Sequence, residues 1–133
     1  MTEFVVLGIP RTPQTKKSKS KDDWKAKVAT AARLAAGTRF VPRSESLSAT
    51  VIYFHRDETE LDVDSIGKLL LDSLEGIFFD NDHQIEQVLL RKTQQNELTL
   101  TNPPPVLAAC VGSEDNFVYV KLGPKPEHQE IPT

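Results

Sequence analysis

The segment 47–55 places the strongest constraint on how this chain can fold. Its residues alternate as in a strand, and both alternating sets are largely apolar: Ala49, Val51 and Tyr53 on one side, Ile52 and Phe54 on the other. A strand that is apolar on both faces has to be covered on both faces. We therefore expect 47–55 to be a central strand of a sheet rather than an edge strand.

Other apolar runs, bounded by turn residues, predict further strands. These runs cover residues 4–9, 85–93, 97–101 and 117–122. Pro10 and Pro13 close the first run, and the polar residues 94–96 join the second run to the third. Residues 123–133, rich in proline and charge, are expected to form a disordered tail.

Two segments carry apolar residues at helical spacing. The first is predicted to begin at Asp22 or Asp23, after a basic loop over residues 15–21, and to end before Gly37. The second covers residues 64–75. Strands and helices thus follow one another irregularly, which indicates an α+β fold. We expect a single small domain over residues 1–122, with a mixed β-sheet flanked by two main helices.

Length and cysteine content restrict the number of domains and the cellular compartment. At 133 residues the chain is long enough for one hydrophobic core and too short for two. Cys110 is the only cysteine, so no disulfide forms within the chain, which is typical of a reducing compartment. The sequence has neither a signal-peptide pattern nor the ~20-residue apolar run of a membrane span. We expect a cytoplasmic protein without membrane contact.

The net charge of −3 hides an uneven distribution. Residues 11–43 hold ten basic and two acidic residues, a charge of +8, whereas the remainder of the chain carries −11. Such a basic segment suits the phosphates of nucleic acids, although a solvated lysine-rich loop has the same composition. The candidate DNA-binding residues are its cations around the start of the first predicted helix: Arg11, Lys16, Lys17, Lys19, Lys21 and Lys25.

Acidic residues around the start of the second predicted helix form the main candidate site. Asp62 and Asp64 stand two apart, a spacing that points both side chains the same way in an extended segment. Asp64 or Ser65 is then expected to cap the helix. Lys68 follows one helical turn after Asp64. Gly67 weakens the helix by ~1 kcal/mol relative to alanine, which favours a close approach by another element at that position.

Asp82 lies beyond this helix, just before the next predicted strand, and a return of the chain can bring it to Asp62 and Asp64. Carboxylates repel one another, so a cluster of them needs a cation. Hard oxygen ligands favour Mg²⁺ or Mn²⁺, and a lysine nearby is typical of phosphate chemistry. The alternative is that Asp62 and Asp64 are cap and turn residues, with Asp64 and Lys68 in an exposed ion pair worth ~0.3–0.5 kcal/mol. His83, next to Asp82, is expected to face solvent.

Four segments in order resemble the RusA family of Holliday-junction resolvases. That family carries a G-x-P turn after an early strand, then D-x-D-N-x-x-K, a helical D-x-L, and D-D-x-Q-[IV]. The counterparts in this chain are Gly8-Ile9-Pro10, Asp62-Val63-Asp64-Ser65-Ile66-Gly67-Lys68, Asp72-Ser73-Leu74 and Asn81-Asp82-His83-Gln84-Ile85. The resemblance spans roughly residues 4–90, and the ordered set is far more specific than any single motif.

This resemblance implies both a function and a set of site residues. Members are homodimeric, Mg²⁺-dependent endonucleases of bacteria and phages that cut four-way DNA junctions by paired symmetric nicks in recombination and repair. By position, Asp62, Asp64 and Asp82 correspond to the catalytic, metal-binding carboxylates and Lys68 to the essential lysine. The cofactor implied is Mg²⁺, for which we expect Mn²⁺ to substitute, and the implied partners are branched DNA and a second copy of the chain.

Two positions depart from the family pattern. Ser65 stands where asparagine is usual, and Asn81 replaces the first residue of the usual aspartate pair. Two alternatives to an active resolvase therefore remain at this point. One is a noncatalytic branched-DNA-binding protein on the same fold. The other is a soluble interaction module whose acidic residues only cap helices.

Overall fold

A computed structural model of the protein describes residues 2–10, 18–37, 45–56, 59, 61–94, 103–110 and 116–124, without the side chains of 18–21. The elements are β1 (Thr2–Leu7), α1 (Ser18–Ala36), β2 (Leu47–His55), α2 (Val63–Leu74), the single 3-10 turn η1 (Asp82–Gln84), β3 (Ile85–Gln94), α3 (Pro105–Ala108) and β4 (Phe117–Pro124). The strand predicted at 97–101 and the tail from residue 125 onward lie outside the described residues.

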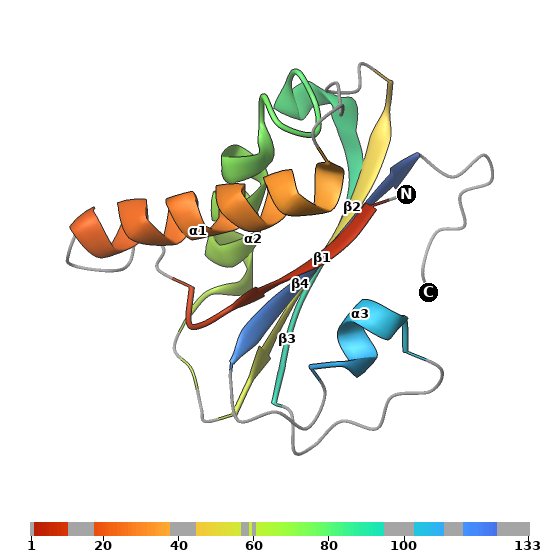
Figure 1. Ribbon diagram of the computed structural model, residues 1–133. Helices are drawn as coiled ribbons and strands as arrows, with labels where there is room; N and C mark the ends of the chain where they lie inside the picture. The colour runs from red at the N-terminus through yellow and green to blue at the C-terminus, as the bar shows by residue number, and fades with distance from the viewer. Residues whose placement is uncertain are drawn as a thin grey trace.

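The four described strands form one mixed sheet in the order β1-β4-β2-β3. Strand β2 is antiparallel to β4 and parallel to β3, and β1 is antiparallel to β4. The prediction that 47–55 is a central strand is therefore confirmed, as is the α+β fold with a mixed sheet. Parallel neighbours need a crossover connection, and α2 provides the one between β2 and β3, running back along the sheet (Figure 1).

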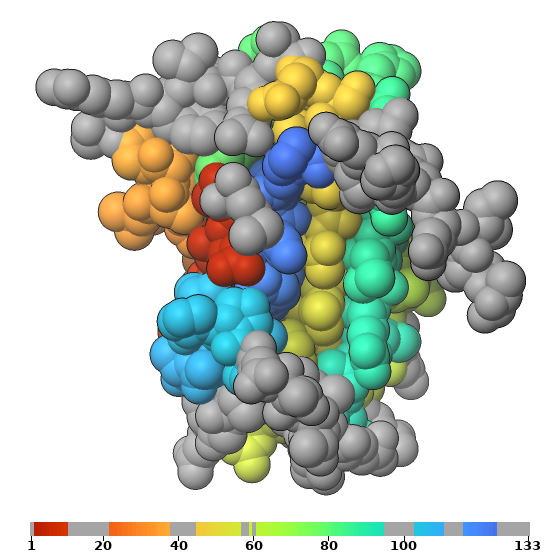
Figure 2. Space-filling view, turned by 90° about the vertical axis from the view of Figure 1, so that its right-hand side faces the viewer, coloured from red at the N-terminus to blue at the C-terminus, as the bar shows by residue number. Residues whose placement is uncertain are grey.

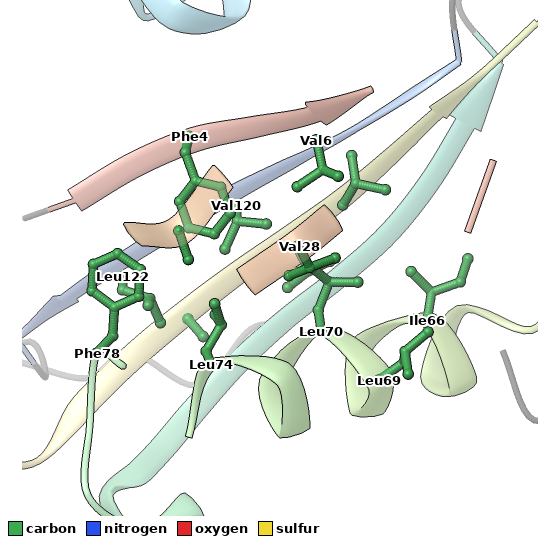
Figure 3. Packing of buried hydrophobic residues seen from close by; sticks show 14 of the residues in the cluster. Phe4, Val6, Val28, Ile66, Leu69, Leu70, Leu74, Phe78, Val120 and Leu122 are labelled. Carbon is green, nitrogen blue, oxygen red and sulfur yellow. The ribbon is translucent and has the colours of Figure 1, made fainter. Parts of the chain in front are cut away.

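Helices α1 and α2 cover one face of this sheet (Figure 1). Trp24, Val28 and Ala32, spaced four apart, give α1 one buried stripe. Helix α2 has a wider apolar face, whose side chains point at the sheet in Figure 3: Ile66, Leu69, Leu70 and Leu74. They pack with alternate residues of β1, β2 and β4 in the main core.

Among the described residues, much less structure covers the opposite face of the sheet. The single-turn helix α3, which was not predicted, packs Leu107 against Phe54, Phe117 and Tyr119. The rings of Phe54 and Phe117 stack with centroids 4.8 Å apart. Figure 2 shows α3 over one part of this face, with β2 and β3 open beside it. On β3, the exposed Leu89 (51%) lies on this face, whereas the exposed Val88 (41%) is aligned with Ala49 and lies on the face that the helices cover.

Element boundaries differ from the prediction at several places, and β1 covers Thr2–Leu7 rather than residues 4–9. Helix α1 begins at Ser18, before Asp22 and Asp23, because the lysine-rich residues between carry no helix breaker and lysine is a good helix former. Helix α2 begins at Val63, so its N-cap is Asp62 rather than residue 64 or 65. Strand β4 extends to Pro124, so residues 123 and 124 belong to the sheet and not to the tail.

Gly67 lets α2 lie close against β3. The close approach of another element, expected from a glycine within this helix, is therefore present. The residue is buried, and a Cβ there would lie 2.7 Å from Cδ1 of Leu90 in β3.

No described helix has the length and apolar character needed to cross a bilayer.

Candidate active site

Asp62 and Asp64 lie at the N-terminal end of α2. Asp62 is the N-cap residue, with extended backbone angles (φ −74°, ψ 135°), whereas Asp64 is already in the first helical turn. The expectation that both stand in one extended segment is therefore wrong, because the helix starts earlier than predicted. Both side chains are exposed, as is that of Lys68 one turn further. The positive end of the helix dipole favours negative charge at this place.

Two contacts that would give these residues a helix-stabilising role are absent among the described residues. The carboxylate of Asp62 makes no capping hydrogen bond with α2. Asp64 and Lys68, both with described side chains, form no ion pair with each other. The side-chain cap and the ion pair are therefore absent, while Asp62 holds the N-cap position and Asp64 lies in the first helical turn.

The connection that leads from β2 into α2 is held by side chains of β3. Lys92 Nζ donates a hydrogen bond to the Leu61 carbonyl oxygen (2.8 Å), and Gln94 Nε2 donates to the Arg56 carbonyl oxygen (2.9 Å). The backbone N–H of Arg56 donates to Asn116 Oδ1 at 2.8 Å. Lys92 and Gln94 were not singled out from the sequence, since they lie inside a strand and belong to no motif.

Asp82 lies on a turn that its own neighbours stabilise. Asn81 Oδ1 accepts a hydrogen bond from the His83 N–H (2.9 Å), and Gln84 Oε1 accepts one from the Asn81 N–H (2.9 Å). The side chains of Asn81 and Gln84 each accept from the backbone of the other, which forms a capping box. Gln84 Nε2 donates to the Glu45 carbonyl oxygen (2.9 Å). The side chains of Asp82 and His83 are exposed, so the prediction for His83 is confirmed.

Asn81 thus has a defined role despite its departure from the family pattern. Its side-chain oxygen caps the turn that presents Asp82. An aspartate carboxylate accepts the same hydrogen bond, because both residues are good N-caps. The asparagine at this position preserves the geometry of the turn.

Within one chain, Asp82 lies far from Asp62 and Asp64. Asp82 precedes Ile85, which pairs with Leu47 at one end of β3, whereas Lys92 contacts Leu61 near the other end. The seven residue-to-residue steps from Ile85 to Lys92 span about 23 Å of strand. Figure 1 shows η1 and the start of α2 at opposite ends of the sheet.

The acidic residues of a single chain therefore form two separate groups. No cluster of three or more His, Cys, Asp or Glu side chains suited to a metal occurs among the residues that the structure describes. The hard carboxylate oxygens of Asp62 and Asp64 are suitable ligands for Mg²⁺ or Mn²⁺. One chain supplies two of the three predicted carboxylates at that place, and the catalytic assignment of Asp62, Asp64, Lys68 and Asp82 stays a prediction.

Most of the predicted DNA-binding residues lie outside the described part of the chain. Lys25 is half-buried in α1. Lys19 and Lys21 have described backbones in α1 but not described side chains, and Arg11, Lys16 and Lys17 are not described. Their role in binding DNA also stays a prediction.

Comparison with models of protein families gives a match over most of the chain. The family model described as "Endodeoxyribonuclease RusA" matches residues 8–101. The matched region holds both acidic groups, the whole of α2 and the whole of β3. No curated protein matches the chain. Because the match covers most of the 133 residues, the protein belongs to the RusA family of endodeoxyribonucleases.

Proposed function

We propose that the protein is a Mg²⁺-dependent endonuclease that resolves four-way DNA junctions by paired symmetric nicks, during recombination and repair. The observation that carries this proposal is the pair of exposed carboxylates, Asp62 and Asp64, at the start of a helix, with Lys68 one turn further. The carboxylate of Asp62 is not used to cap the helix. Family membership supports endonuclease chemistry at this place.

Asp62 and Asp64 would hold the metal ion. When bound, Mg²⁺ polarises a phosphate and lowers the pKa of an attacking water. Lys68 lies four residues after Asp64 and therefore on the same side of α2. Its ammonium either stabilises the charge that develops on the phosphate oxygens or orients the water. The electropositive end of α2 adds a favourable field for an anionic substrate.

The third carboxylate is proposed to come from a second subunit. Two β3 strands paired antiparallel about a two-fold axis run in opposite directions, which brings Asp82 of the partner subunit toward the start of α2. Strand β3 lies at an edge of the described sheet and carries the exposed side chains Val88 and Leu89. A four-way junction requires two symmetric nicks, and such a dimer offers two sites.

Cleavage of a synthetic four-way junction tests the activity. With Mg²⁺ or Mn²⁺ we expect nicks in the junction and none in a linear duplex of the same sequence. Asp64→Asn is expected to bind the junction without cutting it. Cleavage that continues unchanged in EDTA contradicts the metal dependence. Tight junction binding with no cleavage under any divalent ion selects the noncatalytic branched-DNA-binding protein instead.

Mixing two inactive variants tests the shared site. A dimer of one Asp64→Asn chain and one Asp82→Asn chain has one doubly altered site and one unaltered site if each site uses both chains. Random mixing in equal amounts then restores about one quarter of the wild-type sites, and each active dimer makes single rather than paired nicks. If each chain forms its own complete site, the mixture stays as inactive as either variant.

A further inference from the structure

Strand β3 reaches across to the residue that precedes the first candidate metal ligand. We infer that Lys92 is a positioning residue that sets the backbone of Asp62, and that Gln94 supports it. This inference rests on the proposed function, because it assigns a role toward the Asp62–Asp64 pair. It concerns contacts within one chain and does not depend on the dimer.

Two hydrogen bonds fix both ends of the connection between β2 and α2. Lys92 and Gln94 stand two apart in β3, so their side chains leave the same face of the sheet. Gln94 Nε2 holds the carbonyl of Arg56, the residue directly after β2, at 2.9 Å. Lys92 Nζ holds the carbonyl of Leu61, the residue directly before the N-cap, at 2.8 Å.

The bond from Lys92 acts directly on Asp62 through the planar peptide group. The Leu61 carbonyl and the Asp62 N–H belong to one peptide plane, so fixing the oxygen fixes the orientation of the chain as it enters Asp62. The first hydrogen bond of α2 runs from the Ile66 N–H to the Asp62 carbonyl oxygen (3.2 Å), and no cap by the Asp62 side chain stands beside it. Lys92 replaces a side-chain cap as the anchor of the helix start.

This arrangement explains how Asp62 can be both an N-cap residue and a metal ligand. A carboxylate that caps a helix accepts hydrogen bonds from backbone N–H groups. Because Lys92 fixes the entry to α2 from outside, the Asp62 carboxylate is not needed for capping.

The test compares Lys92→Met, Lys92→Arg and a matched control, Arg91→Met. Methionine keeps the length of the side chain and removes the donor and the charge, whereas arginine keeps both. Arg91 is exposed and pairs with Ile52, so its side chain lies on the other face of the strand from Lys92. Arg91→Met therefore removes the same charge from the neighbouring position without touching Leu61.

For Lys92→Met we expect kcat on a four-way junction with Mg²⁺ to fall about 10- to 100-fold, because small displacements of reacting groups cost that much. The KM for the junction is expected to stay unchanged. Lys92→Arg should recover most of the activity, and Arg91→Met should behave like the wild type. Hydrogen exchange gives a readout without catalysis: the Ile66 amide should exchange faster in Lys92→Met and not in Arg91→Met.

Three results would overturn the inference. One is unchanged exchange at Ile66 in Lys92→Met. Another is a raised KM with an unchanged kcat, which makes Lys92 a DNA contact. The third is an equal loss of kcat in Arg91→Met. If the wild-type protein cleaves no junction with any divalent ion, the proposed function fails, and exchange at Ile66 alone decides whether Lys92 holds the start of α2.

Discussion

The two groups of acidic residues, one near each end of strand β3, are held in place in different ways. At one end, Asp62 and Asp64 stand on a helix whose entry is held by Lys92 and Gln94, residues about thirty positions further along the chain. At the other end, Asp82 stands on a turn held mainly by its immediate neighbours through a capping box. The first end depends on tertiary packing, whereas the second is largely determined by local sequence.

Because of this difference, the Asp62–Asp64 group is sensitive to changes far along the chain. Anything that shifts α2 against β3 moves Asp62 and Asp64 relative to the rest of the domain. The turn with Asp82 tolerates such shifts, because its hydrogen bonds, apart from that of Gln84 to Glu45, lie within a few residues. Substitutions near each group therefore test whether tertiary packing or local hydrogen bonds hold it in place.

The largest effect is expected from removing one carboxylate at either end. Asp64→Asn and Asp82→Asn should each lower junction cleavage about 1,000-fold or more, because a carboxamide is a poor ligand for a hard cation. Both variants should keep junction binding and stability. Single-turnover cleavage is the measurement, with Glu75→Gln at the end of α2 as the control. Loss at only one end would show that the two groups do not serve one reaction.

A bulky side chain at Gly67 should disturb only the end built on α2. Gly67→Val is expected to destabilise the protein by about 1–3 kcal/mol, because it overpacks the contact with Leu90. Gly67→Ala should cost far less, since the tip of Leu90 can rotate and alanine favours the helix by ~1 kcal/mol. Urea denaturation measures both. Adding Leu90→Ala to Gly67→Val should recover part of the loss, and strict additivity would contradict the contact.

The cap on the turn offers a smaller and more local test. Asn81→Ala should cost about 1 kcal/mol, because the His83 N–H loses its acceptor. Asn81→Asp should stay close to the wild type in stability, since aspartate caps equally well. Exchange of the His83 amide should rise in the alanine variant alone. A change at Ile66 in the same variant would contradict the separation between the two ends.

Tyr119 lies in neither group of acidic residues, and its substitution should have the smallest effect on stability. Burial raises its pKa well above the usual range, helped by a hydrogen bond of 2.8 Å to Glu3 and by the charge of Glu3. The folded state therefore keeps a proton that the unfolded state loses near pH ~10. This contribution is fully present below that pH and is lost as the pH rises through the raised pKa. Tyr119→Phe should flatten the fall in stability above pH ~10 and leave cleavage unchanged.

Much of the fold could be predicted because local periodicity encodes it. The doubly apolar pattern around Val51 identified the central strand, and the spacing of Ile66, Leu70 and Leu74 identified the buried face of α2. Gly67 indicated a close contact before its partner Leu90 was known. These signals lie within one element and need no knowledge of chain direction.

The relation between the acidic residues could not be read from spacing. Whether Asp82 returns to Asp62 depends on the direction of the strand after α2. The crossover between parallel strands runs α2 antiparallel to β3, which places Asp82 at the far end. Lys92 was missed for a similar reason, since its contact with Leu61 arises only from the packing of two elements.

The position of β4 has a consequence for how this protein is made. Strand β4, synthesised last, lies between β1 and β2, and Thr2 pairs with Leu122. Contacts so distant along a chain form slowly and only after both partners exist. On the ribosome, β1 has no neighbour in the described sheet until translation of residues 117–124 is complete. The sheet of a nascent chain therefore stays incomplete until β4 has been made.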